Sequence, residues 1–326
     1  MTKQINFKKL MKSYELILKI RYAEDLLGKK KKKGFINSPV HLSAGQEAIP
    51  VGISLNRKSG DVFFGNHRSH HHLLSLESNL TKFFAEILCK KNGLSDGYGA
   101  SMHLVDKSKG FFGSVPIVTG SLSLATGAAF ALKQKKTDNI AVAYLGDGAT
   151  EEGVFHESLL FSGKSNLPIL YVIENNEYSS NMHISLRQVS SNLTRFAKAH
   201  GINYVSLNGN SIFDVYSITK KIISKIRSSK KPFLIEAKTY RFYGHVDWRD
   251  DIDVGIERSK SKLNYWKKKD PINLIENFII KKKLISQKKL DLIKIKVDKQ
   301  VQNSWINAIK FKNQTKSDLN KNIFND

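Results

Sequence analysis

The second half of the chain alternates short apolar runs with amphipathic stretches, a pattern typical of strands joined by helices. Four apolar runs predict buried strands, because each is short and is followed by polar or turn residues. They cover residues 140–145, 168–174, 204–207 and 232–237. Between them, residues 151–164 and 212–226 read as helices, and the second is clearly amphipathic. Strands that alternate with helices predict an α/β fold with a doubly wound parallel sheet.

Helical periodicity also marks both ends of the chain. Residues 7–27 carry apolar side chains at helical spacing, and we expect a lysine-rich loop to follow at 28–34. Beyond Asp270 the apolar residues again fall three or four apart, and the excess of lysine there predicts a solvated helical layer around the sheet. The predicted units are an N-terminal helical arm (1–34), an α/β domain (35–260) and a C-terminal helical extension (261–326).

The segment from about 35 to 120 is dense in glycine and histidine. Because Gly-rich stretches let the backbone approach a ligand closely, we expect little regular structure there. Three consecutive histidines, His70–His72, lie in this segment. Since adjacent helical positions do not converge, they predict the start of a helix with one inward imidazole rather than a metal site.

Composition limits the possible classes of protein. With 326 residues, 40% of them hydrophobic and 10% aromatic, the chain is long enough for one large α/β domain with arms and is not generally disordered. A single cysteine excludes an internal disulfide framework and a Cys-based zinc site. We find neither an apolar run of the roughly 18 residues that a spanning helix needs nor a signal peptide. We therefore expect a soluble, cytoplasmic protein that does not contact a membrane.

The net charge of +24 raises the possibility of a nucleic-acid-binding protein. Only nine of the 53 basic residues are arginine, however, and nucleic-acid surfaces rely on arginine for bidentate contacts and on aromatic rings for stacking. The lysines instead form runs at 29–33, 267–269 and 281–283. We interpret them as a solvated surface that steers anionic small molecules, and we expect no nucleic-acid partner.

The sharpest chemical signal is the stretch 146-GDGATEEGVFHESLLFSGKSNLPILYVIENNEYS-179. One predicted strand ends at Gly-Asp-Gly and the next at Asn-Asn, so Asp147 and Asn176 follow two strands at the edge where α/β sheets hold ligands. Glycines let backbone N–H groups reach a diphosphate, and the helix that follows adds its positive end. Carboxylate and amide oxygens suit Mg²⁺. The stretch therefore predicts a site for Mg²⁺ and a diphosphate.

This stretch closely resembles the motif of the E1 components of 2-oxo acid dehydrogenases that depend on thiamine diphosphate (ThDP). The chain is similar to their α subunits, in the pyruvate and acetoin dehydrogenase group, from about residue 10 to 310. Further motifs agree in order and spacing: 41-HLSAGQEA-48, His67-Arg68, 100-ASMH-103, Ile117-Val118 and 239-TYRFYGH-245. The resemblance implies the diphosphate-binding type of α/β domain.

The resemblance also assigns roles to individual residues. It implies Mg²⁺ ligands at Asp147, Asn176 and the main-chain carbonyl of Tyr178. It implies cofactor contacts from His41, His67, Arg68, Pro116, Val118, Asp147, Gly148, Ala149, Asn176, Arg241 and His245. We assign proton transfer to His245 and His103, because histidine is suited to it near neutral pH.

A multisubunit enzyme is the further implication of the resemblance. In that family ThDP serves as the electron sink for decarboxylation, and a separate β subunit supplies the activating glutamate. The α2β2 heterotetramer passes the acyl group to the lipoyl domain of an E2 acyltransferase. Pyruvate is the leading substrate among the small 2-oxo acids. Acetoin, a branched-chain 2-oxo acid, or a relative that works without an E2 are the alternatives.

Several residues differ from the family's motifs or fit more than one role. His67 stands where the family has tyrosine, so the pyrimidine contact at that position is open. The segment 247–251, Asp-Trp-Arg-Asp-Asp, differs from the loop at the substrate entrance of relatives and leaves the substrate open. Arg68 and Arg241 fit phosphate oxygens through their fixed fork of donors, but each fits a structural ion pair as well.

Overall fold

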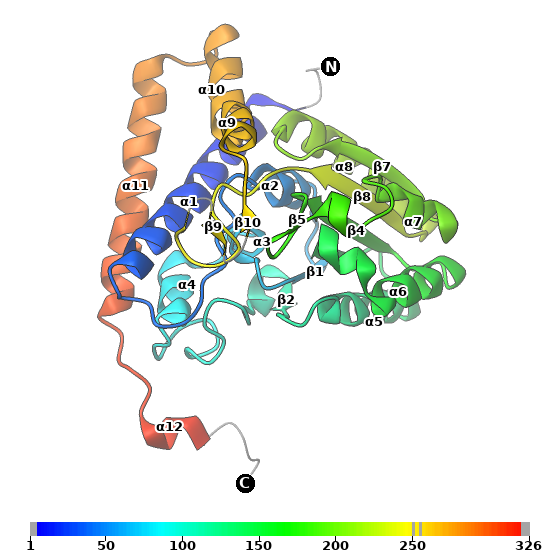
Figure 1. Cartoon of the computed structure of the whole chain (residues 1–326), viewed down its shortest axis with the longest axis horizontal. Coiled ribbons are helices and arrows are strands. Elements are labelled where there is room, and N and C mark those ends of the chain that lie inside the picture. The colour runs from blue at the N-terminus through cyan, green and yellow to red at the C-terminus, as the bar shows by residue number, and fades with distance from the viewer. Residues whose placement is uncertain (1–4, 250–251, 254–255, 321–326) are drawn as a thin grey trace.

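The computed structural model describes residues 5–249, 252–253 and 256–320. Its centre is a six-stranded parallel sheet in the order β2-β1-β3-β4-β8-β7 (Figure 1). The strands are β1 (Val62–Gly65), β2 (Phe111–Ser114), β3 (Ala141–Gly146), β4 (Ile169–Asn175), β7 (Asn203–Asn208) and β8 (Phe233–Lys238). Helices cover both faces of the sheet, so the predicted doubly wound α/β fold is confirmed.

The four strands expected from apolar runs are all present. β3 and β4 lie in the middle of the sheet, and every residue of β4 is buried, which is why both read as continuous apolar runs. Their register pairs Leu145 with Ile173 and Gly146 with Glu174, so the two strands end at the same level. The sheet therefore brings the residues that follow these strands to one edge.

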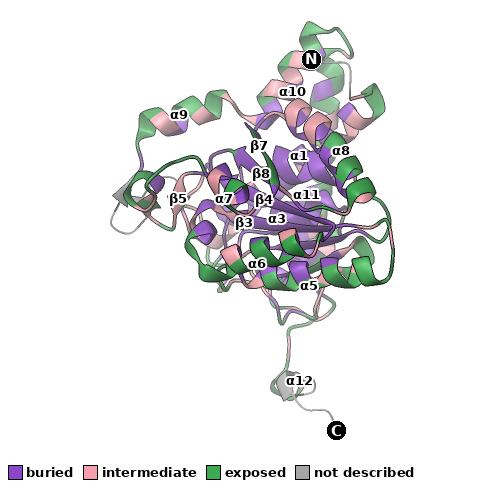
Figure 2. Ribbon diagram, turned by 90° about the vertical axis from the view of Figure 1, so that its right-hand side faces the viewer, coloured by how far each residue is buried: buried purple, intermediate pink, exposed green. Residues whose placement is uncertain are grey.

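Apolar side chains fill the space on each side of the sheet. The helices on one face are α5 (Gly120–Gln134), α6 (Gly153–Lys164) and α7 (Thr194–Ala199). The helices on the other face include α2 (Ala48–Ser54), α3 (His70–Ser75) and α8 (Ile212–Ser229). Figure 2 shows α5 and α6 in front of the buried strands, with exposed residues on their outer side. The predicted helices at 151–164 and 212–226 correspond to α6 and α8.

The N-terminal helix is longer than predicted. Helix α1 runs from Phe7 to Lys32, and the side chain of Asn6 caps it by accepting a hydrogen bond of 2.9 Å from the backbone N–H of Lys9. The prediction of a loop from residue 28 was therefore wrong for residues 28–32. Lysines in the last turn of a helix interact favourably with the helix dipole, so this lysine run extends the helix.

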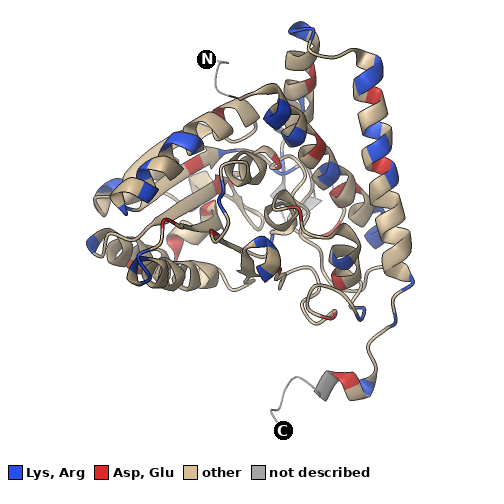
Figure 3. Ribbon diagram, turned by 180° about the vertical axis from the view of Figure 1, so that it is seen from behind, with Lys and Arg blue, Asp and Glu red and all other residues tan. Residues whose placement is uncertain are grey.

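Two helices from the C-terminal part of the chain, α10 (Pro271–Lys281) and α11 (Gln287–Ile309), pack outside α1 as a second layer. That part also contains α9 (Lys260–Lys268), whose Leu263 packs with Tyr240 and Phe242, and α12 (Lys316–Asn320), which lies apart from α1. Helix α11 packs against α1 and against α4 (Leu80–Ile87), and it buries Leu290, Val297, Val301 and Trp305. Lysines lie along the outer side of this long helix, as Figure 3 shows from behind. The predicted solvated layer is thus present, and α1 separates it from the sheet.

Residues 35–120 contain more regular structure than predicted. They include α2, α3, α4, β1 and β2, and α5 begins at Gly120. Each of the five is short and mostly buried, and only α4 has an exposed polar side, so the sequence offers few positions from which a helical or strand period can be recognised. The expectation of little regular structure was wrong for this reason, although residues 88–106 consist mainly of turns.

Short elements complete the fold. Three 3-10 helices are η1 (Lys107–Lys109), η2 (Asp147–Glu151) and η3 (Ile184–Leu186). Two antiparallel hairpins pair β5 (Tyr178–Ser179) with β6 (Met182–His183), and β9 (Ile252–Asp253) with β10 (Ile256–Glu257). The first hairpin follows β4 and packs against η2, at the carboxyl edge of the sheet. Within the described residues, no helix is long and apolar enough to cross a membrane.

Candidate functional site

A cavity of about 260 Å³ opens at the carboxyl edge of the sheet, where β3 and β4 end. It brings together most of the residues that sequence reasoning assigned to the site. Those that line it are His41, His67, Arg68, Pro116, Val118, Asp147, Gly148, Ala149, Asn176, Tyr178 and His245. Arg241 and His103 are not among the lining residues. Residues far apart in the sequence therefore converge as the predicted topology requires.

Asp147 occupies the position between β3 and the cavity. It begins η2 directly after Gly146, and only 1% of its surface is exposed. Its carboxylate forms an ion pair with Arg187, a residue that sequence reasoning did not single out. Burial raises the pKa of the Asp147 carboxyl, and Arg187 opposes that shift. A buried carboxylate at a cavity wall is a ready ligand for a cation.

Asn176 and Gln46 form the second polar wall. The Asn176 amide donates to the Gln46 side-chain oxygen at 2.9 Å, and the Asn176 side-chain oxygen accepts from the backbone N–H of Tyr178 at 3.2 Å. These bonds fix the direction of the Asn176 oxygen. The amide nitrogen of Gln46, Nε2, is buried with no hydrogen-bond partner among the described residues. Such an atom at a cavity wall indicates a place for a polar ligand.

The two glycines of the Gly-Asp-Gly turn differ in how much space surrounds them. A Cβ at Gly146 would meet no atom within 4 Å, whereas a Cβ at Gly148 would lie 2.3 Å from the hydroxyl oxygen of Ser179. The turn and the β5–β6 hairpin can therefore pack this closely only with glycine at 148. The first turn of α5, with Ser121 and Leu122, lines the cavity, and no residue of α6 does. The helix start at the cavity is thus that of α5, not the predicted α6.

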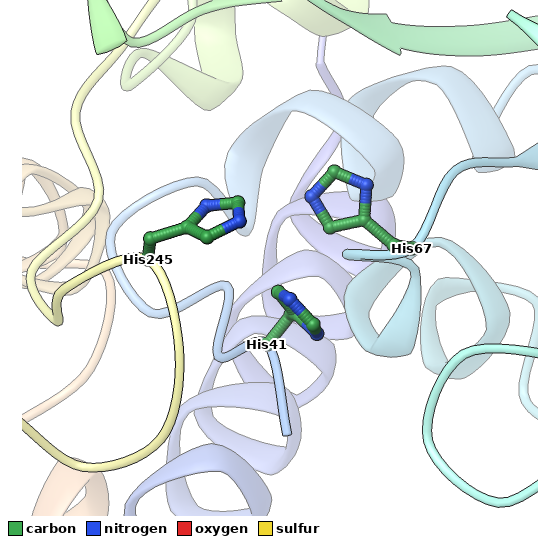
Figure 4. A group of neighbouring side chains, drawn as sticks. All are labelled: His41, His67 and His245. Carbon is green, nitrogen blue, oxygen red and sulfur yellow. The ribbon is translucent and has the colours of Figure 1, made fainter. Parts of the chain in front are cut away.

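Three imidazoles meet at the cavity wall (Figure 4). His41 precedes α2, His67 follows β1 and His245 follows β8. The ring centroids lie 4.7 Å apart for His41 and His67, 5.1 Å for His41 and His245, and 5.4 Å for His67 and His245. One nitrogen of each ring lies within 4.8 Å of the others, so the group could hold a metal ion. The Nδ1 atom of His41 is buried without a partner within the described part of the chain.

The three imidazoles are neutral at physiological pH. Burial lowers the pKa of His67 to about 3 and that of His245 to about 2, and the pKa of His41 still further. Arg68 adds to each shift, because a nearby guanidinium disfavours a second positive charge. Neutral imidazoles can donate and accept hydrogen bonds toward a ligand. The cavity therefore gets its positive charge from arginine, not from histidine.

Arg68 determines which nitrogen of His245 carries the proton. Its guanidinium donates to the main-chain carbonyls of Leu42 at 2.7 Å and His245 at 3.0 Å, and lies 3.2 Å from Nδ1 of His245. A guanidinium has no acceptor, so Nδ1 of His245 must accept and the proton must reside on Nε2. That nitrogen lies 3.4 Å from the hydroxyl of Ser180. The contacts of Arg68 thus include bonds to two carbonyls and to an imidazole.

Arg241 and His103 do not line the cavity. Arg241 is 1% exposed, donates to the main-chain carbonyl of Ser180 at 2.6 Å, and faces the ring of Tyr178 at 6.0 Å. It therefore supports the segment 178–180, which carries three lining residues. His103 is exposed and lies in a turn, with its backbone N–H bonded to the carbonyl of Gly99. The roles that the resemblance gives these two residues stay predictions.

All three of the histidines His70–His72 are buried, so the expectation of one inward imidazole was wrong. His70 bonds Glu24 at 2.9 Å and Ser101 at 2.8 Å. His71 and His72 bond the two carboxylate oxygens of Glu174 at 2.8 and 3.1 Å. Helix α3 is enclosed by α1, α2 and the sheet, so side chains that point in different directions all meet protein.

Glu174 connects the buried histidines to the cavity. It is the penultimate residue of β4, two positions before Asn176, and it lines the same cavity. His71 and His72 hold the pKa of Glu174 down to about 2 against the effect of burial, and burial lowers the pKa of His72 to about 4. Ligand atoms of His71, His72 and Glu174 lie within 4.8 Å of one another, so this group could also hold a metal ion.

Sequence reasoning missed several polar residues of the site, among them Gln46, Glu174 and Arg187. Gln46 lies inside the quoted 41–48 motif, and Arg187 is one of only nine arginines, so weak signals existed for both. No local pattern marks Glu174, because its function depends on partners about 100 positions away in the chain. Asp250 and Asp251, from the predicted entrance loop, lie outside the described residues, as do the ends of both predicted arms.

Residues 14–316 match the profile of the family "Dehydrogenase E1 component". The alpha subunit of acetoin:2,6-dichlorophenolindophenol oxidoreductase from Bacillus subtilis (strain 168) is 35% identical over 269 residues, which cover 82% of this chain and 80% of that protein. The pyruvate dehydrogenase E1 alpha subunit of Rhizobium meliloti (strain 1021) is 33% identical, and the match covers 82% of this chain and 76% of that protein. The corresponding subunit of Rickettsia typhi is 32% identical, and the match covers 89% of this chain and 88% of that protein. The chain therefore belongs to the dehydrogenase E1 component family, as an alpha subunit.

Proposed function

We propose that the chain is the α subunit of a ThDP-dependent 2-oxo acid dehydrogenase E1, with pyruvate as its leading substrate. One observation carries the proposal: Asp147, Asn176 and Tyr178 line one cavity at the ends of two neighbouring strands. The β subunit, the E2 acceptor and Mg²⁺ belong to the same proposal, and so does a cytoplasmic location. Family membership and the cavity's chemistry support it together.

The residues of the cavity fit Mg²⁺ and a diphosphate. The Asp147 carboxylate, the Asn176 side-chain oxygen and the Tyr178 carbonyl are hard oxygen donors, which Mg²⁺ prefers. The buried Nε2 of Gln46 has no partner among the described residues, and the space at Gly146 is open, so polar ligand atoms can be received there. Gly148, Ala149 and the first turn of α5 would present backbone N–H groups to the diphosphate.

Bound ThDP would supply the electron sink for the bond that breaks. The chain's own residues bind, orient and exclude water. Leu122, Leu145 and Met102 form apolar parts of the wall. His245 is neutral and carries its proton on Nε2, so it can donate a hydrogen bond from Nε2 to an oxygen of a bound ligand at the cavity wall. This is a proton-holding role that a neutral imidazole fixed by Arg68 can perform.

An exposed apolar face on α5 and α6 supports the proposal that this chain binds a partner subunit. Its exposed apolar side chains are Leu124, Phe130, Val154, Leu160 and Phe161. Three charged residues lie on the two helices, Lys133, Glu157 and Lys164, in a chain of net charge +24. Interface cores are poor in charge, so this α5–α6 face suits the β subunit. It starts at the cavity, because the first turn of α5 lines it.

The substrate is the least determined part of the proposal. The relatives include both acetoin- and pyruvate-oxidising enzymes at similar identity. A branched-chain 2-oxo acid, or a reaction without an E2, are further alternatives. The cavity wall on this chain does not distinguish among these substrates, since the β subunit would complete the site.

Activity of the two-subunit complex tests the proposal. The chain would be co-expressed with a β subunit encoded beside it and assayed with an artificial electron acceptor, Mg²⁺ and ThDP. Pyruvate, acetoin, 2-oxobutanoate and branched-chain 2-oxo acids would form the panel. A ThDP-dependent rate with one substrate supports the proposal and identifies that substrate. ThDP binding without turnover of any of them would contradict the dehydrogenase assignment and favour a relative without an E2.

His245→Ala tests the proposed proton-holding role. The variant should bind Mg²⁺ and ThDP within a few-fold of the wild type, because other residues contribute the metal ligands and the diphosphate cradle. Acyl transfer to a lipoyl domain should fall by about 10²-fold or more, the usual contribution of a positioned hydrogen-bond donor to charge that develops in a transition state. The measurement is single-turnover reductive acylation of the lipoyl domain. Unchanged acylation would remove His245 from the mechanism.

A further inference from the structure

Arg187 lies in the segment that folds over the Gly-Asp-Gly turn. It directly follows η3, and its side chain is only 6% exposed. The guanidinium contacts three groups: the Asp147 carboxylate through Nη2, the Glu151 carboxylate through Nη1, and the Met182 carbonyl at 3.1 Å through Nε. A planar guanidinium held by three acceptors in different directions has one orientation. Arg187 is therefore a fixed part of the wall behind η2.

The guanidinium contacts Asp147 without lining the cavity itself. Asp147 lines the cavity, whereas Arg187 is not among the lining residues. The guanidinium meets Oδ2 of the carboxylate. It forms no hydrogen bond with the other carboxylate oxygen, Oδ1, among the interactions of the described residues. This arrangement holds the carboxylate without filling the cavity.

The segment that carries Arg187 also packs closely on the turn. A Cβ at Gly148 would lie 2.3 Å from Ser179 Oγ and 3.5 Å from Nη1 of Arg187. Gln188 reinforces the contact, because its side-chain amide donates to Glu151 at 2.8 Å. The turn with the predicted metal ligand and the segment after β6 therefore form one packed unit.

We infer that Arg187 is a positioning residue for the metal ion: it holds the Asp147 carboxylate through Oδ2 and so presents Oδ1 to a divalent cation in the cavity. The inference rests on the proposed function, since it takes Asp147 as a metal ligand. A ligand that is already held in place loses little conformational freedom on binding, and residues that orient ligands commonly contribute 10- to 100-fold to metal affinity.

Arg195 provides a matched control for a merely structural role. It anchors the same segment, donating to the carbonyls of Ser190 at 2.8 Å and Asn192 at 2.9 Å and to the side chain of Gln188. It makes no contact with Asp147 among the interactions of the described residues. If Arg187 only anchored the segment, replacing either arginine would have the same effect.

The test measures Mn²⁺ binding rather than turnover. Mn²⁺ would be titrated into the two-subunit complex with saturating ThDP, and free Mn²⁺ followed by its electron paramagnetic resonance signal. The variants are Arg187→Met, Arg187→Lys and Arg195→Met, each checked for an unchanged melting temperature in the absence of ligands. We expect Arg187→Met to bind Mn²⁺ roughly 10- to 100-fold more weakly. Arg187→Lys should recover part of the loss, and Arg195→Met should bind like the wild type.

Other outcomes overturn the inference in distinguishable ways. Wild-type affinity in Arg187→Met would show that Asp147 needs no support from the arginine. Tighter binding would show that the guanidinium competes with the metal. Equal losses in Arg187→Met and Arg195→Met would assign the effect to the segment as a whole. A wild-type complex that binds no Mn²⁺ with ThDP would refute the proposed function itself, and the inference with it.

Discussion

The carboxyl edge of the sheet and the outer helical layer of α1, α10 and α11 are built in opposite ways. The edge buries polar side chains, and several of their atoms, among them Gln46 Nε2, His41 Nδ1 and the Tyr144 hydroxyl, have no hydrogen-bond partner within the described residues. The layer buries mainly apolar side chains, which join α11 to α1 and α4, although Trp305 Nε1 there also has no partner among the described residues. Buried polar atoms without partners reduce stability, so their grouping in residues that line one cavity indicates a ligand site.

The comparison teaches that binding and stability reside in different parts of this molecule. Substitutions at the edge should change ligand affinity more than the free energy of unfolding. Substitutions in the helical layer should do the reverse.

Trp305→Ala should have the largest effect on stability. Trp305 is 2% exposed and packs edge-on against Phe84 at 5.5 Å, between α11 and α4. Removing a buried indole leaves a cavity, so the free energy of unfolding should fall by about 3–5 kcal/mol. Urea denaturation measures it. Trp305→Phe is the control: it should cost less, because it keeps a ring and removes Nε1, which has no partner among the described residues. Weaker binding of ThDP in folded Trp305→Ala protein would break the separation.

Asp147→Ala should affect binding and leave the fold largely intact. Asp147 is a ligand at the cavity wall and not part of the apolar core. Loss of a metal ligand should weaken Mg²⁺-dependent ThDP binding at least roughly 100-fold, about 2.7 kcal/mol. Titration calorimetry on the two-subunit complex measures the affinity, and circular dichroism checks the fold. Normal affinity in this variant would refute the assignment of the site.

Acid should destabilise the protein through the cavity histidines. The pKa of His67 is lowered to about 3 and that of His245 to about 2, chiefly by burial, and that of His41 is lower still. Below pH 6.5 the unfolded chain takes up protons that the folded chain does not. The stabilisation is therefore complete above about pH 7 and declines as the pH falls, by about 1 kcal/mol per histidine between pH 7 and 5.5.

Urea midpoints measured from pH 7.5 to 5.5 would show this decline. His67→Asn removes one of these groups and should reduce the decline by about 1 kcal/mol, whatever its effect at pH 7.5. An equal decline in wild type and variant would mean that His67 is protonated in the folded protein, against the cause given for its lowered pKa.

Two exposed apolar residues should give the smallest effects on stability. Leu160 on α6 is 58% exposed and Ile295 on α11 is 64% exposed. Leu160→Gln and Ile295→Gln should each change the free energy of unfolding of the isolated chain by less than about 0.5 kcal/mol. Only Leu160→Gln should weaken association with the β subunit, measured by analytical ultracentrifugation. Equal association of both variants would show that the α5–α6 face is not the β-subunit interface.

The sequence predicted best those parts of the fold that a single short stretch of residues determines. β3 and β4 are buried on both sides, so their apolar runs and the polar residues after them predicted the sheet edge and placed Asp147 and Asn176 together. The family's motifs added His41, His67 and His245, which no local pattern would join. The sequence could therefore predict the site residues that follow the two central strands and those that lie in the family's motifs.

The rest depends on three-dimensional packing that no local pattern encodes. The lysine run after residue 27 continues α1, because the helix dipole and the helix already formed favour it. His70–His72 are all buried, because α3 is enclosed by its neighbours. Arg187 meets Asp147 across 40 positions of chain, through a hairpin whose fold the sequence did not predict. Charge and composition alone gave no indication of these contacts.

Locating the metal ion tests the central claim most directly. Crystals of the two-subunit complex would be grown with ThDP and Mn²⁺, and anomalous difference maps collected at the manganese edge. The account predicts a peak about 2.2 Å from an Asp147 carboxylate oxygen, the Asn176 side-chain oxygen and the Tyr178 carbonyl. A peak at the His41–His67–His245 group or at the His71–His72–Glu174 group, with none at Asp147, would contradict it.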